Sequence, residues 1–268
     1  MSFSRFDISL VRVSVGSAAA AGVLSFGGLA FATLDGWPVW ARGVAAVLPW
    51  LPVFAQRTAA IYHEYQWLAL FYALVVTQTA HFLEHVAQMV QIHVLGLNGA
   101  DARGIFGALD IEWVHFIWNT WVLLAVLVLL SRFGSNRWLW LTAVLSGWHE
   151  AEHAYIFSIY LATDVPGTPG LLSHGGVLGG GLPVSRPDLH VVYNLIETVP
   201  LVPGFLAQIQ CTLPRTLRRH GRGPGGPIGP LGEGLRLPST SSTKLGFASR
   251  TQIALWAAEH TRTTCDLV

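Results

Sequence analysis

Charged residues are scarce in this chain. Asp, Glu, Lys and Arg make up 12% of its 268 residues and hydrophobic residues make up 52%, whereas about a quarter of a soluble globular domain is charged. This shortage of charge and a mean hydropathy of +0.48 predict an integral membrane protein. The net charge is only +1, so the chain lacks the basic excess with which proteins bind nucleic acids, and we expect no nucleic-acid partner.

Cysteine is scarce as well. The two cysteines, Cys211 and Cys265, allow one disulfide bond at most. They exclude a disulfide-stabilised scaffold and a metal site built from several cysteines. The glycine-rich stretch at residues 175–181 is not followed by Gly-Lys-Ser or Gly-Lys-Thr, which excludes a phosphate-binding loop of the P-loop type.

Long apolar stretches are abundant, and they predict six membrane-spanning helices, since about 20 apolar residues cross a bilayer. The expected spans cover residues 13–34, 38–56, 60–95, 109–131, 138–162 and 188–210. Arg42, Pro49 and Pro52 favour a kinked or re-entrant second span. The third is longer than a bilayer requires, so we expect it to project or bend. We interpret the first as a retained helix, because its apolar stretch is long for a signal peptide.

Two short patterns occur twice in these apolar segments. The pattern H-x-x-E-H occupies residues 81–85 and 149–153, and H-[FV]-[IV]-[WY]-N follows at residues 115–119 and 190–194. The loops between them also share a Gly-x-x-Gly stretch, which we align as residues 104–107 with residues 176–179. The repetition predicts an all-α membrane protein, a six-helix bundle with a duplicated four-helix metal-binding core in which the two repeats run parallel.

The expected organisation has three parts. Residues 1–57 form N-terminal membrane helices, residues 58–211 form the duplicated core (repeats at about 58–131 and 136–210), and residues 212–268 form a disordered tail rich in Arg, Gly, Pro, Ser and Thr. Basic residues concentrate in cytoplasmic loops, so Arg57, Arg132, Arg137 and the tail are expected in the cytoplasm. The loops at 97–108 and 163–187 then face outward, from a plasma (inner) membrane.

The repeated patterns carry residues that bind transition metals. Residues four apart share a helix face, and ionisable groups at membrane depth usually mark function because they are costly there. We expect the motif histidines to converge in one layer nearer the outer face, with the two glutamates bridging metal ions or orienting the histidines. The candidate ligands are His81, Glu84, His85, His115, His149, Glu152, His153 and His190.

Other polar residues on the same helices are expected to assist. Glu112, Glu150 and Glu197 are candidate catalytic carboxylates beside the metal, whereas Asn119, Asn194 and Tyr193 are candidates for hydrogen bonding to the ligands. We expect one or two metal ions, and because the two halves offer equivalent ligand sets, a symmetric site with two ions is preferred. Iron or copper is preferred, zinc is an alternative, and haem is a lesser one.

Four functions fit these residues. The first is a di-metal oxidoreductase that acts on a small or lipophilic substrate. Its histidine-rich bundle is similar to that of the membrane desaturases and hydroxylases with histidine boxes. Those boxes include two adjacent histidines, and this chain has no His-His dipeptide, so no residue roles carry over. The second is a zinc hydrolase, with Glu150 of His149-Glu150-Ala151-Glu152-His153 as base, although Phe82 replaces that base in the first repeat. A haem-binding electron carrier (using His81 with His93) and a metal transporter remain open, as does the oligomeric state. Membrane lipid is an expected partner in all four.

Overall fold

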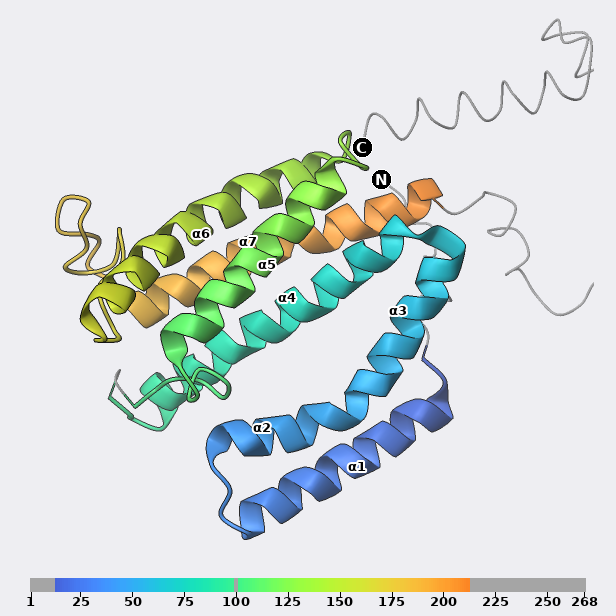
Figure 1. Ribbon diagram of the computed structural model, residues 1–268, viewed down its shortest axis with the longest axis horizontal. Coiled ribbons are helices and arrows are strands. Elements are labelled where there is room, and N and C mark those ends of the chain that lie inside the picture. Colours follow the sequence, from blue (N-terminus) through green and yellow to red (C-terminus); the bar gives the residue numbers. More distant parts are fainter. Residues whose placement is uncertain (1–12, 99–100, 213–268) are drawn as a thin grey trace, which may run out of the picture.

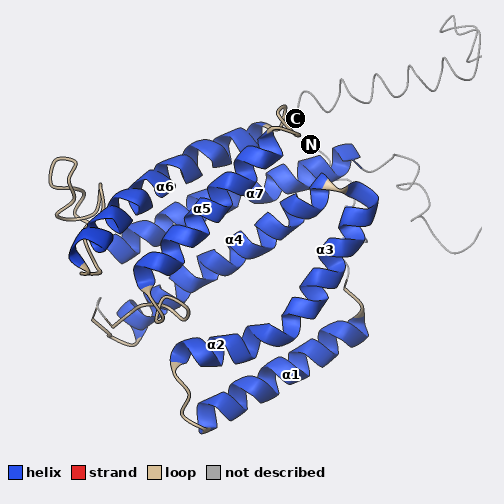
Figure 2. Cartoon of the chain, viewed as in Figure 1, coloured by secondary structure: helices blue, strands red, loops and turns tan. Residues whose placement is uncertain are grey.

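The computed structural model describes residues 13–98 and 101–212 of the chain, and this part of the chain is helical without a strand (Figures 1 and 2). Short 3-10 and π-helical segments, η2 and η3, interrupt or extend the α-helices. The elements are α1 (Val15–Leu34), α2 (Val39–Val47), η2 (Leu48–Trp50), α3 (Leu51–Tyr65), α4 (Trp67–Met89), η3 (Val90–Val94), α5 (Ile111–Leu130), α6 (Arg137–Thr163) and α7 (Arg186–Thr212). The expected disordered tail lies outside the described residues.

Helices α4 to α7 form a bundle, and α1 to α3 lie beside it (Figure 1). Within the bundle α4 contacts α5 and α7, and α6 contacts the same two helices, so the four make a closed ring. Asp110 and Asn136 fix where α5 and α6 begin, because each side chain accepts hydrogen bonds from two backbone N–H groups of the first turn. This ring turns one face of every helix toward a shared interior.

Four helical segments are long and apolar enough to cross a membrane: Val15–Leu34, Val39–Tyr65, Ile111–Leu130 and Arg186–Thr212. Helices α4 and α6 are not among them, although they are comparably long. They carry the two H-x-x-E-H motifs, which reduce their apolar character. The fold is therefore an all-helical bundle consistent with a membrane protein.

The expected boundary between the second and third spans is wrong. The helix begun at Val39 does not end at residue 56 but continues to Tyr65, kinked by the 3-10 turn at Leu48–Trp50. The chain reverses at Gln66, whose φ of 42° lies in the left-handed region. Arg57 consequently lies inside α3 rather than in a loop, so it no longer marks a helix end. Arg132 lies between α5 and α6, and Arg137 is the first residue of α6, so both remain at the helix ends where they were expected.

The bundle has an apolar half and a polar half. The apolar half uses the beginnings of α4 and α6 and the ends of α5 and α7, where Phe71, Leu139 and Leu201 are fully buried. The other half uses the opposite ends of the same helices and buries histidines, carboxylates and amides instead. Since buried polar groups are costly without partners, the interactions of that half decide what it is for.

Candidate metal centre

Six histidines meet in the polar half of the bundle. They form two clusters of three, each with one ligand nitrogen per residue and all three nitrogens within 4.8 Å of one another. We call His81, His85 and His115 the α4–α5 triad, and His149, His153 and His190 the α6–α7 triad. All six side chains are buried. The convergence of the motif histidines, expected from their spacing, is thus present in the structure.

The distances within each triad match those around a bound ion. The Nε2 atoms of His81 and His85 are 3.3 Å apart, and those of His149 and His153 are 3.1 Å apart. Two nitrogens bound tetrahedrally to one ion at about 2.0–2.1 Å would be separated by roughly 3.3 Å. Each pair of histidines therefore already has the spacing of two ligands on a common ion.

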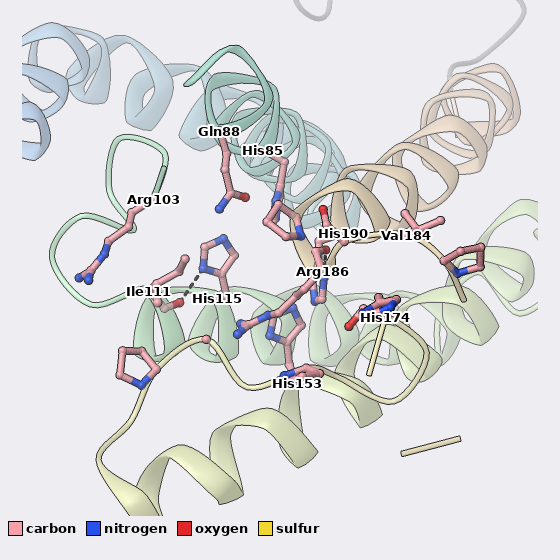
Figure 3. A pocket seen from close by; sticks show the side chains of 17 residues that line it. His85, Gln88, Arg103, Ile111, His115, His153, His174, Val184, Arg186 and His190 are labelled. Atoms are coloured by element: carbon pink, nitrogen blue, oxygen red, sulfur yellow. Dashed lines mark hydrogen bonds between the residues drawn. The ribbon is translucent and has the colours of Figure 1, made fainter. Parts of the chain in front are cut away.

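The two triads lie against each other. The rings of His85 and His190 have centroids 6.2 Å apart, and those of His115 and His153 are 5.9 Å apart and nearly parallel. Figure 3 shows these four side chains turning toward a common space from four different helices. The arrangement would place two ions next to each other, each on its own set of three imidazoles.

A cavity of about 680 Å³ opens from these four histidines toward the loops. His81 and His149 do not line it; they lie one helical turn deeper, and at most 1% of either residue is exposed. Four prolines, Val184 and Ile111 supply much of the remaining wall, with Gln88, Arg103, His174 and Arg186 as its main polar groups (Figure 3). The cavity is thus large enough for a small organic molecule in contact with both triads.

No protein-family model, curated protein or solved structure matches this chain. Its chemistry must therefore be inferred from the geometry of the centre. One atom is especially informative. His190 donates from Nδ1 to the backbone oxygen of Arg186 at 2.8 Å, and its Nε2 is buried without a partner. A buried lone pair of this kind is costly, and a metal ion would compensate it.

The backbone also orients the corresponding histidine of α5. His115 Nδ1 lies 2.6 Å from the backbone oxygen of Ile111 (Figure 3). Asn119 and Asn194, expected beside the ligands, donate to the backbone oxygens of His115 and His190 rather than to their rings. They therefore support the helix turn that carries each ligand.

The two motif glutamates hydrogen-bond to groups other than the histidines of the triads. Glu84 Oε1 accepts hydrogen bonds from the backbone N–H groups of Ile105, Phe106 and Gly107 at 2.6, 2.7 and 3.0 Å. Glu152 accepts one from the hydroxyl of Tyr193 at 3.1 Å. Neither carboxylate belongs to the two histidine clusters found among the described residues.

Glycines allow the loops to approach these carboxylates. A Cβ on Gly104 would lie 2.9 Å from Cδ of Glu84, and a Cβ on Gly170 would lie 2.7 Å from Cδ of Glu152. Gly170, not Gly176, thus holds the position over Glu152 that Gly104 holds over Glu84. The expected alignment of the loop at 104–107 with residues 176–179 needs this correction; the glycine-rich segment forms a separate turn closed by a bridge between Gly176 and Gly180.

The three candidate catalytic carboxylates have different surroundings. Glu112 forms a bidentate ion pair with Arg186, at 2.6 and 2.8 Å, beside the cavity. Glu150 accepts a hydrogen bond from Thr120 at 2.7 Å. Only Glu197 contacts a motif histidine, through a 2.9 Å hydrogen bond to Nδ1 of His149.

Some cavity residues carried no recognisable signal in the sequence. Arg103, His174 and Arg186 line the cavity, and nothing repeats at their positions, whereas Gln88, which also lines it, shares the helix face of His81 and His85. Arg186 precedes His190 by one helical turn, which is the only local hint. His93 is more than half exposed and pairs with Asp188 at 2.7 Å, so it does not join His81 in the arrangement that a haem would need.

Proposed function

We propose that this protein is a membrane oxidoreductase with two copper ions, one on each histidine triad. The observation that carries the proposal is the pair of buried three-histidine clusters, adjacent to each other and in contact with one cavity. A structural ion would need neither the second triad nor the cavity. A pair of ions beside a substrate-sized space is instead suited to two-electron chemistry.

The ligand set favours copper over iron. Carboxylate-rich sites suit harder ions, whereas imidazole suits copper and zinc, and copper binds most tightly among the divalent first-row metals. The carboxylates of Glu84, Glu112 and Glu152 are engaged by loops, an arginine and a tyrosine. Six neutral imidazoles remain. Zinc would satisfy the same ligands, but it has no redox chemistry that would use a matched pair of sites.

The cavity suggests the kind of substrate. It opens among the loops that follow α4 and α6, and no Asp or Glu is among the described residues that line it. Two bound cations would therefore meet little negative charge from its walls. This arrangement favours a small neutral or anionic organic molecule that enters from the aqueous side, and it disfavours a cationic one.

The reaction consistent with such a centre is the two-electron oxidation of that molecule. The substrate would lose two electrons and two protons, and dioxygen would accept both to become hydrogen peroxide. Two copper ions would supply a pair of one-electron centres. The chain itself would hold the ions, exclude bulk water from the deep histidines His81 and His149, and orient the substrate through the cavity walls.

We also propose that the bundle arose by duplication. Trp118 and Tyr193, which hold the same position of the second repeated motif, also pack alike, each with its ring centroid 5.2 Å from that of His81 or His149. Gly104 and Gly170 match as well.

With Arg132 and Arg137 placed in the cytoplasm, the cavity faces outward, from a plasma membrane. A single cysteine at Leu97, but not one at Ser135, should then react with an impermeant maleimide added from outside; the reverse result would overturn this orientation.

Metal analysis of the purified chain tests the proposed function most directly. We expect two copper ions per chain in detergent, and loss of both in a variant that combines His85→Ala with His153→Ala. Glu64→Gln, a change of an exposed carboxylate outside the bundle, should leave the metal content unchanged. A wild-type chain that binds no copper, or that binds zinc only, would contradict the proposal. A haem absorption band would instead identify the protein as a haem-binding one.

A further inference from the structure

The two triads differ in the hydrogen-bond partners of their imidazoles, although their histidines match one for one. This difference concerns metal binding, so any consequence of it rests on the proposed function. In the α6–α7 triad, His149 and His190 both have a partner at Nδ1, respectively Glu197 and a backbone oxygen. In the α4–α5 triad, only His115 has one. The Nδ1 atoms of His81 and His85 are buried without a partner.

Glu197 is the main cause of this asymmetry. Its carboxylate lies 2.9 Å from Nδ1 of His149, and both side chains are 1% exposed. The second carboxylate oxygen lies 3.4 Å from the amide nitrogen of Gln78, which also donates to Asn194. With its Nδ1 proton held by Glu197, His149 keeps the Nε2 lone pair that faces His153 at 3.1 Å.

The other half of the bundle lacks an equivalent carboxylate. Glu197 follows His190 by seven residues, and the residue that follows His115 by seven is Val122, which is fully buried. Valine can neither orient the ring of His81 nor compensate the charge of an ion bound to it. The rings that flank the deep histidines, Trp118 and Tyr193, are equally close on the two sides, so the distance of the flanking ring does not distinguish them.

We infer that the two triads bind their ions unequally, with the α6–α7 triad loaded first and Glu197 as the positioning residue that makes it the tighter site. A carboxylate that accepts a hydrogen bond from a ligating histidine fixes its tautomer and raises its basicity, and removing such a partner typically costs 10–100-fold in metal affinity. The buried negative charge also favours a cation nearby. At limiting copper the chain therefore holds one ion, and the α4–α5 triad exchanges its ion more readily.

A titration of the apo full-length chain in detergent with copper(I), in competition with a colorimetric chelator, tests this inference. We expect two steps whose dissociation constants differ by about 10–100-fold. His153→Ala should remove the tighter step and His85→Ala the weaker one. This assignment of the steps does not require a Glu197 variant to fold.

Glu197→Gln then tests the cause. It should weaken the tighter step by about 10–100-fold and leave the weaker step unchanged. Glu64→Gln is the control, because Glu64 is an exposed carboxylate outside the bundle, and neither step should change. Two steps of equal affinity, loss of the tighter step in His85→Ala, or equal weakening of both steps by Glu197→Gln would each overturn the inference. In all three cases the wild-type chain would still bind two ions, whereas failure of the proposed function would leave no copper to titrate.

Discussion

Replacing Glu84 by Gln distinguishes a loop anchor from a metal ligand. In the structure one oxygen of Glu84 accepts three backbone hydrogen bonds, from Ile105, Phe106 and Gly107. Hydrogen bonds to a charged group contribute about 1.5–3 kcal/mol each, and neutral ones about 0.5–1.5. The amide oxygen of glutamine can still accept them, so the loss is about 1 kcal/mol for each bond and, because such bonds are not independent, roughly 2–3 kcal/mol in total.

The assay combines thermal unfolding with metal analysis of the same samples. A loss of 2–3 kcal/mol corresponds to a fall in Tm of roughly 4–12 °C for a chain of this length. Glu84→Gln should show that fall and keep both copper ions, whereas His85→Ala should keep only the ion of the α6–α7 triad. The exposed Glu64 is the control, and Glu64→Gln should change neither quantity. A Glu84→Gln chain with unchanged Tm and one ion fewer would refute this reasoning and restore Glu84 as a ligand.

Three further substitutions test the fold around the centre. Gly170→Ala places a Cβ against the buried carboxylate of Glu152 and should destabilise the chain by about 1–3 kcal/mol in thermal unfolding. Gly27→Ala is the control, because no atom lies within 4 Å of its new Cβ, and it should be neutral or stabilising. Leu139→Ala should cost about 2–5 kcal/mol, because it opens a cavity in the apolar half. Glu112→Gln leaves the partly buried Arg186 without its charged partner and should lower the free energy of unfolding by about 3 kcal/mol. Adding Arg186→Met to the same chain should restore most of that stability. A double variant that is no more stable than Glu112→Gln alone would contradict this account.

The convergence of the six histidines could be predicted because the determining information is local. A spacing of four residues places two histidines on one helix face wherever the helix packs. The recurrence of H-x-x-E-H then suggests that two such faces meet. The helix content and the positions of α5, α6 and α7 followed from apolar length in the same way, to within about two residues.

What the sequence did not reveal depends on single torsions and on distant loops. The reversal at Gln66 uses one residue in the left-handed region, and hydropathy has no signal for a torsion angle. Glu84 precedes His85 by one residue, so it lies about 100° away from it around the helix. Its partners are backbone groups more than 20 residues away, and no spacing pattern identifies them. The contact between Glu197 and His149 depends likewise on how α6 packs against α7.

The depth of His81 and His149 constrains how the centre could be assembled. An ion that entered through the cavity, which opens among the loops after α4 and α6, would pass the other four histidines before it reached these two residues. With the proposed orientation, those loops meet the extracytoplasmic compartment. Biogenesis would then have a fixed order: the helices insert first, and the apoprotein acquires its metal afterwards. With that orientation, the ions would be taken up from the extracytoplasmic side.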